Sequence, residues 1–330
     1  MLKSILSILE RKQVSVKTRL SVHFFASDSL CVFNRLFKAI SQCREILHRC
    51  NNTQVQFQAS CALKSAFPRD CIDISKEELL QLICAMLEIV QSKDCTNQVR
   101  EQLVAIVAIA VKRNTGQNKN ADGIEIVQQR IQELASGNEK QNQILAASLI
   151  SALVQEFSSA GKSSVIGLSL EGHAAAKIFY ENNALPGVFS LVLNFFKYLN
   201  SNPQMIQDES DQLLVSKFLE IGHMILSWRF THGRASRLAL LKADSTVEVP
   251  FQPPSSWSDL VTSSDFVNVW FSTHGVVRRI PQLANLSSNC IQQICSLKGS
   301  IFPNLDAEAK WTGSFSYRSG YAWCDTNLFH

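Results

Sequence analysis

The stretch QILAAS at residues 143–148 has two counterparts earlier in the chain, QLVAIV at 102–107 and QASCAL at 58–63. Each stretch opens a helical pattern, and a second helical pattern follows it. The three starts are 44 and 41 residues apart. A helix pair that recurs roughly every 40 to 47 residues is typical of HEAT repeats. The spacing therefore predicts an all-α, HEAT-repeat (armadillo-like) solenoid.

The segment from Glu139 to Phe157 shows the helical period most clearly. Leu145, Leu149 and Leu153 are four residues apart, and neighbouring apolar side chains widen the stripe that they form. A single helix pair of this kind cannot bury both of its apolar faces, so successive pairs stack and share a continuous core. We expect a right-handed superhelix of antiparallel helix pairs, about six or seven in all.

Other segments predict where helices begin and how deeply they lie. Ser75 precedes two acidic residues and reads as the cap of a helix over Leu79–Val90. The segment Val99–Val111 is apolar all round from Leu103, so other helices must cover it on several sides. Further helices are expected over Ala184–Leu199, over Asp211–Phe230, near Trp257, over Asp265–Arg279 and over Leu283–Leu297, with a proline-containing loop over Asp244–Ser255.

Composition restricts the class of protein. Hydrophobic residues make up 46% of the 330 residues and charged residues 18%, which is typical of a globular chain. The net charge of +4 is too small to indicate nucleic-acid binding. The longest apolar run, Leu103–Val111, is about half the length that a bilayer requires, so we expect no membrane insertion. The ten cysteines are scattered, and Cys43, Cys50, Cys61 and Cys84 have the apolar neighbours of structural thiols.

The ends of the chain differ from its middle. Residues 1–50 contain nine Lys or Arg against three acidic residues. We expect residues 1–32 to form a divergent basic segment that is partly helical, and residues 33–303 to form the solenoid. Residues 304–330 are rich in aromatic side chains without a regular period, and we expect them to be an irregular tail outside the solenoid.

Motifs of catalysis are lacking. Gly161-Lys162-Ser163 resembles the end of a phosphate-binding loop, but Glu156 stands where an earlier glycine is required. The seven histidines show no metal-ligand spacing, and Cys290 and Cys295 have no second pair to complete a zinc site. His223 and His274 lie on apolar helices and read as core or interface residues. We therefore predict that the chain is not an enzyme and uses no cofactor or metal.

Several blocks of sequence resemble the exportin-4 family of karyopherin-β (importin-β superfamily) nuclear export receptors, in its N-terminal portion. The most specific block runs from Ser136-Gly137-Asn138 through Leu145–Leu153 to Glu156-Phe157-Ser158-Ser159, and is followed by Lys162–Glu171 and His173. Supporting blocks are Val99–Leu103, Val111-Lys112-Arg113, Ile225–Phe230, Ser256-Trp257, Phe271–His274 and Ser296–Pro303. The resemblance covers roughly residues 33–303 and is specific as a set.

The resemblance implies a function in binding. Receptors of this family take up cargo in the nucleus together with Ran-GTP, pass the pore by touching Phe-Gly nucleoporins, and release cargo when the GTP is hydrolysed. The family cargoes include a hypusine-bearing translation factor and a Smad protein. The implied location is the nucleus and cytoplasm, with shuttling through the nuclear pore.

The resemblance also implies that inner helices of the N-terminal repeats contact Ran. If Leu79–Val90 is the inner helix of its repeat, polar residues on it and on the equivalent helices before and after it are candidates. The candidate Ran or cargo contacts are Arg35, Lys38, Arg44, Glu77, Glu78, Glu88, Glu125, Gln129 and Arg130.

Two other interpretations remain open at this point. The first is a HEAT-repeat scaffold that assembles proteins independently of Ran. The second is an organellar helical protein with a transit peptide, which rests on the basic, nearly acid-free residues 1–27. Nucleotide-dependent Ran binding separates the receptor from the scaffold, and the location of a tagged chain tests the organellar interpretation.

Overall fold

The fold is that of a computed structural model, which describes residues 32–50, 52–70, 75–92, 95–118, 121–137, 139–158, 168–231, 250–302 and 304–311. The described residues form helices joined by turns and loops, with no strand among them. They group into two compact units. The first contains Met1–Ser136 and Ser148–Phe179, and the second contains Gly137–Ala147 and Tyr180–His330.

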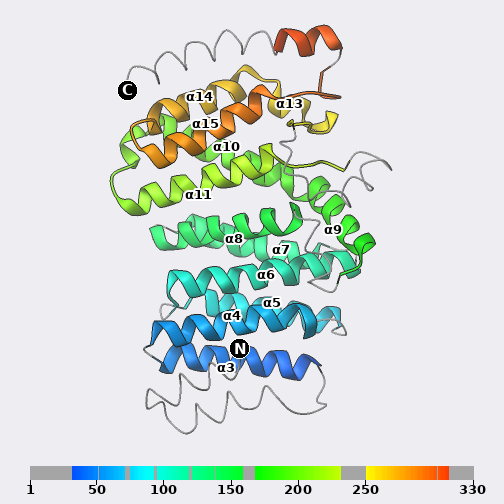
Figure 1. The fold of residues 1–330 in the computed structure, drawn as a ribbon, viewed down its shortest axis with the longest axis vertical. Helices are drawn as coiled ribbons and strands as arrows, with labels where there is room; N and C mark the ends of the chain where they lie inside the picture. The colour runs from blue at the N-terminus through cyan, green and yellow to red at the C-terminus, as the bar shows by residue number, and fades with distance from the viewer. Residues whose placement is uncertain are drawn as a thin grey trace. The chain divides into compact units, whose positions relative to one another are not determined.

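The first unit is built from two layers of helices (Figure 1). Its helices are α3 (Val32–Arg49), α4 (Thr53–Asp70), α5 (Lys76–Val90), α6 (Asn97–Asn118), α7 (Asp122–Ser136), most of α8 (Lys140–Ser158) and the larger part of α9 (Leu170–Asn183). Helix α3 packs on α4 and α5 packs on α6, each after a short connection. Helices α3, α5 and α7 contact one another in turn and form one layer, and α4 contacts α6 in the other layer. This repetition of stacked helix pairs confirms the all-α, HEAT-like fold.

Two detailed predictions for this unit are confirmed. Ser75 caps α5: its hydroxyl accepts from the Glu78 amide at 3.3 Å, and the Glu78 carboxylate accepts from the Ser75 amide at 3.1 Å. Residues 103–116 of α6 are buried apart from the half-buried Ala105. They are covered because α4, α5 and α7 all pack against this helix.

The close packing of α9 against α6 depends on glycine. A Cβ at Gly116 would lie 2.8 Å from the Gly172 carbonyl oxygen, and a Cβ at Gly172 would lie 2.9 Å from a methyl group of Leu168. Because Gly116 has no Cβ, the backbone of α6 can lie close to the Gly172 carbonyl group of α9 at this crossing.

The second unit repeats the layered arrangement. Its helices are α10 (Leu185–Ser201), α11 (Glu209–Leu226), α13 (Ser258–Val261), α14 (Ser264–Val277) and α15 (Pro281–Cys295), with the ends of α8 and α9 and the 3₁₀ turns η2 (Pro203–Met205) and η3 (Ser255–Trp257). Helix α10 packs on both α11 and α14, and α15 packs on both α11 and α14 (Figure 1). Two antiparallel pairs therefore stack with like helices in contact, as in the first unit.

Aromatic side chains fill the core of the second unit. The Phe189 ring has its centroid 5.4 Å from that of Trp257, 6.0 Å from that of Phe266 and 6.5 Å from that of Trp270. These separations are in the range that aromatic pairs prefer. The rings come from α10, η3 and α14, so this cluster joins the helix pairs to the turn that precedes α14.

Some boundaries differ from the prediction. The helix expected to reach Phe230 ends at Leu226, because Trp228 and Phe230 are buried and make side-chain contacts that a continuing helix would not supply. Cys84 was expected among structural thiols, but it is exposed on α5. Cys43 and Cys95 are buried, and burial raises the pKa of Cys43 to about 12 and that of Cys95 to about 11.

The predicted separation of the two end segments, residues 1–32 and 304–330, from the solenoid remains almost entirely a prediction. Residues 1–31 and 312–330 lie outside the described residues. Residues 305–311 are helical, and Trp311 packs on Phe302 with ring centroids 5.8 Å apart. The basic N-terminal segment, the irregular tail and the handedness of a superhelix stay predictions.

Candidate protein-interaction surface

The solvent face of α5 is a polar stripe. Glu77, Gln81, Cys84 and Glu88 are all exposed, at intervals of four, three and four residues. This spacing puts them on one side of the helix. The opposite side is buried and packs on α6. The sequence pattern alone therefore determines which carboxylates of α5 face solvent.

Helix α7 continues this face. Glu125, Gln129 and Gln132 are exposed with the same spacing. Two contacts tie α7 to α5: Lys76 and Asp122 form an ion pair at 2.6 Å, and Arg130 donates to the Gln91 side chain at 3.5 Å. We call the exposed side of α5 and α7 the acidic face, because its exposed carboxylates are Glu77, Glu88, Glu125 and Glu133.

The candidate residues are distributed over the layer of α3, α5 and α7, which contact one another in that order. The side chains of Arg35 and Arg44 lie outside the described residues, whereas Lys38 is exposed on α3. Glu78 is half-buried and engaged in the cap of α5. Arg130 is half-buried and pairs with Glu133 at 3.1 Å. The remaining candidates, Glu77, Glu88, Glu125 and Gln129, are exposed.

Sequence reasoning missed a cluster of buried basic groups in the first unit. Lys112, His173 and Lys177 are each at most 1% exposed, and the charges of the two lysines act on His173. The Lys112 ammonium donates to the backbone oxygen of Glu156, near the end of α8, and lies 3.1 Å from the Glu156 carboxylate. It thus satisfies one of the last carbonyl groups of that helix and favourably meets the negative end of the helix dipole.

His173 is the most perturbed group of this cluster. Burial, followed by the neighbouring charges of Lys112 and Lys177, lowers the pKa of His173 to about 3. Neither ring nitrogen has a hydrogen-bond partner among the described residues. His173 is therefore neutral near pH 7, and its perturbation has a structural cause in burial beside two cations.

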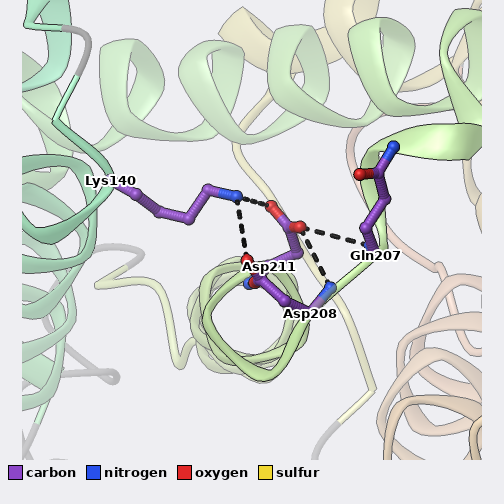
Figure 2. Close-up of polar contacts among 4 residues, drawn as sticks. All are labelled: Lys140, Gln207, Asp208 and Asp211. Carbon is purple, nitrogen blue, oxygen red and sulfur yellow. Dashed lines mark hydrogen bonds and ion pairs between the residues drawn. The ribbon is translucent and has the colours of Figure 1, made fainter.

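A second polar cluster lies at the start of α11, in the second unit (Figure 2). Asp208 and Asp211 form a capping box, and the Asp211 carboxylate also accepts from the Gln207 amide at 3.2 Å. Lys140 forms an ion pair with Asp211 and lies 3.9 Å from Asp208. Burial raises the pKa of Asp211, but the hydrogen bonds from Lys140 and the two backbone amides outweigh it and leave the pKa below its ordinary value.

A third cluster holds the chain after α11. Glu181 is buried, and its carboxylate accepts from Trp228 Nε1 at 2.8 Å, from the Thr231 hydroxyl at 3.1 Å and from the Thr231 amide at 3.2 Å. Trp228 also stacks on Tyr180, with ring centroids 6.1 Å apart. One carboxylate thus satisfies three donors at the point where the chain leaves the helix.

Replacing Glu181 with alanine is expected to lower the free energy of unfolding by about 2–3 kcal/mol, because buried donors lose a charged acceptor. Urea unfolding followed by circular dichroism measures the change. Asn182→Ala, at the exposed next position of the same helix, is the matched control and should stay within about 0.5 kcal/mol of the original chain. Equal values for the two variants would contradict the role assigned to Glu181.

One Ser–His contact resembles a catalytic nucleophile with its general base, but its hydrogen bond runs in the opposite direction. His274 Nδ1 lies 2.9 Å from Ser287 Oγ, and that hydroxyl donates to the Ala284 carbonyl oxygen at 2.9 Å. The imidazole must then donate its proton to the hydroxyl, whereas a general base would accept one. Ser287 is 1% exposed, so the pair joins α14 to α15 as an interface contact.

The described ranges contain neither a metal cluster nor a membrane span. Within them, no three metal-ligating side chains come together. No described helix is both long and apolar enough to cross a bilayer. The Gly161-Lys162-Ser163 stretch lies outside these ranges.

Comparison with known proteins identifies the family. The family model for Exportin-4 matches residues 6–315, a range that extends the resemblance seen in the sequence at both ends. Exportin-4 of Dictyostelium discoideum is 22% identical over 281 residues, which are 78% of this chain and 25% of the relative. Exportin-7-B of Xenopus laevis is 21% identical over 298 residues, which are 89% of this chain and 26% of the relative. The chain spans about a quarter of the length of these curated relatives. It belongs to the exportin-4 family.

Proposed function

We propose that the chain is the N-terminal part of a nuclear export receptor, which binds Ran-GTP and protein cargo and moves between nucleus and cytoplasm. The observation that carries this proposal is the match of the Exportin-4 family model over residues 6–315. Family membership also favours a transport receptor over an enzyme. Contact with Phe-Gly nucleoporins, and cargoes such as the hypusine-bearing translation factor and the Smad protein, belong to the same proposal.

The Ran contact is proposed for the layer of α3, α5 and α7. The exposed carboxylates of the acidic face support it, since they would attract a basic surface on a partner. The ties between α5 and α7 hold these carboxylates on a rigid support, which lowers the entropy lost on binding. Lys38, Arg35 and Arg44 on α3 would extend the contact to acidic groups of the partner.

A binding mechanism follows from the stacked pairs. Each pair contacts its neighbours only, so small changes at each interface add up to a change in curvature. If Ran-GTP and cargo both favour one curvature, each raises the affinity of the receptor for the other by the same factor. Binding of cargo would then depend on the nucleotide on Ran without direct contact between cargo and nucleotide.

Reversing two charges of the acidic face tests the contact. The double variant Glu77→Lys with Glu125→Lys is expected to weaken binding to Ran-GTP at least about tenfold, by placing cations against a basic partner. Glu101→Lys is the matched control, because Glu101 is exposed on α6 in the other layer. Biolayer interferometry at two salt concentrations measures both. Equal effects of the double variant and the control would exclude this face as the Ran contact.

A further inference from the structure

The second helix of a pair holds the end of the first helix by the same kind of contact in three pairs. The fourth residue of α4, α6 and α8 is Gln56, Arg100 and Gln143, respectively. Each side chain donates to one or two backbone carbonyl groups at or just after the end of the preceding helix. The three residues are 44 and 43 positions apart, so the contact recurs with the period of the helix pairs. We call this contact the pair brace.

In the pair of α3 and α4, the brace is Gln56. Its side chain is buried, and Nε2 donates to the Leu47 and Cys50 carbonyl oxygens, both at 3.0 Å. Leu47 lies in the last turn of α3, and Cys50 follows that helix. The last four carbonyl groups of an α-helix have no partner within the helix and need a donor from elsewhere. The side-chain amide of Gln56 therefore caps α3 from α4.

In the pair of α5 and α6, the brace is Arg100. Its Nε donates to the Val90 carbonyl oxygen at 3.0 Å, and its Nη2 donates to the Ser92 carbonyl oxygen at 3.3 Å. Nη1 donates to the Asn97 side chain at 3.0 Å, which also fixes the guanidinium on the first turn of α6. A cation at the C-terminal end of a helix is favoured by the helix dipole. Arg100 thus holds the end of α5 to the start of α6.

Two contacts between neighbouring pairs differ from the brace. Lys64 donates to the Gln102 side chain at 3.0 Å and joins α4 to α6, and Arg130 donates to the Gln91 side chain at 3.5 Å and joins α7 to the end of α5. Each of these contacts joins two side chains, and the rotatable bonds on both sides let the helices shift while the hydrogen bond is kept. A brace ends on the backbone itself, so its carbonyl group cannot shift without the helix.

We propose that the pair brace makes each helix pair of the first unit a rigid module, so that the stack bends between pairs and not within them. Unwinding the last turn of α3 or α5 would break both hydrogen bonds of its brace, which makes fraying at these ends more costly than at an uncapped helix end. The side-chain contacts between pairs can adjust instead. The brace acts in the chain alone, so the proposal holds whether or not Ran is the partner.

Amide hydrogen exchange of the whole chain tests the brace. In the unmodified chain, residues 47–50 and 89–92 should be protected, although helix ends ordinarily exchange fast. In Arg100→Met, the amides of residues 89–92 are expected to exchange about tenfold faster, while residues 47–50 keep their rates. In Gln56→Met the reverse is expected. Methionine keeps an unbranched side chain at both positions but removes the donors, and each variant is the control for the other.

Two further variants separate the brace from a general loss of stability. Lys64→Met removes a contact between pairs and should leave both segments unchanged. Arg100→Lys restores a donor, so residues 89–92 should exchange more slowly than in Arg100→Met. The proposal is overturned if either brace variant accelerates both segments equally or leaves its own segment unchanged. It is also overturned if Lys64→Met matches the brace variants, or if Arg100→Lys and Arg100→Met behave alike.

Discussion

Replacing Trp270 with alanine is expected to lower the free energy of unfolding by about 3–5 kcal/mol, the largest loss foreseen for the second unit. Trp270 on α14 is 1% exposed, and its ring centroid lies 5.1 Å from that of Phe196 and 6.5 Å from that of Phe266. A Cβ at Gly222 would lie 2.6 Å from the indole ring, so α11 closes over it. The truncated side chain leaves a cavity that three helices surround and cannot easily collapse.

Urea unfolding followed by circular dichroism measures this change without relying on tryptophan fluorescence. The indole N–H has no acceptor among the described residues, so the loss comes from packing alone. Tyr198→Ala is the control, since this α10 side chain is 58% exposed and should change stability by less than about 0.5 kcal/mol. A loss below about 1 kcal/mol for Trp270→Ala would contradict the aromatic core described for this unit.

Lowering the pH from 7 to 5 is expected to cost about 2 kcal/mol of stability through His173. The folded pKa of His173 is about 3, whereas its ordinary value is 6.5. Below pH 6.5 the unfolded chain binds a proton at this position that the folded chain does not bind. Stability therefore falls as the pH drops below 6.5, and the loss continues until about pH 3.

His173→Gln isolates this effect, because glutamine has no proton to gain. The difference in unfolding free energy between pH 7 and pH 5 should be smaller in the variant by about 2 kcal/mol. The window ends at pH 5 so that most carboxylates stay ionised in both states. The same pH dependence in both chains would show that His173 is not held neutral beside Lys112 and Lys177.

Much of the fold follows from spacing alone. The capped start of α5 and the burial of α6 on all sides could be predicted because each follows from a short local pattern in the sequence. The end of α11 could not, because the apolar run continues through Trp228 and Phe230. What ends the helix is distant in sequence: the carboxylate of Glu181 and the ring of Trp257.

The candidate surface could likewise be predicted from the sequence only in part. The exposed stripes of α5 and α7 follow from helical spacing, and the alternation of layers follows from the repeat. The buried cluster of Lys112 and His173 could not be foreseen, because an isolated basic residue in a helix normally reaches solvent. Only the stacking of α6 and α9 in one unit brings these residues together. The pair of Lys140 and Asp211 likewise joins residues 71 positions apart.

The measurement that tests the central claim is the binding of the purified chain to Ran loaded with a non-hydrolysable GTP analogue, compared with Ran-GDP. The account predicts selective binding to the GTP form. To include the repeats beyond this chain, the same comparison is made with residues 34–303 grafted onto the remaining repeats of a full-length exportin-4. If this chimera bound both forms of Ran equally or neither of them, the export-receptor account would be contradicted, and a Ran-independent scaffold would replace it.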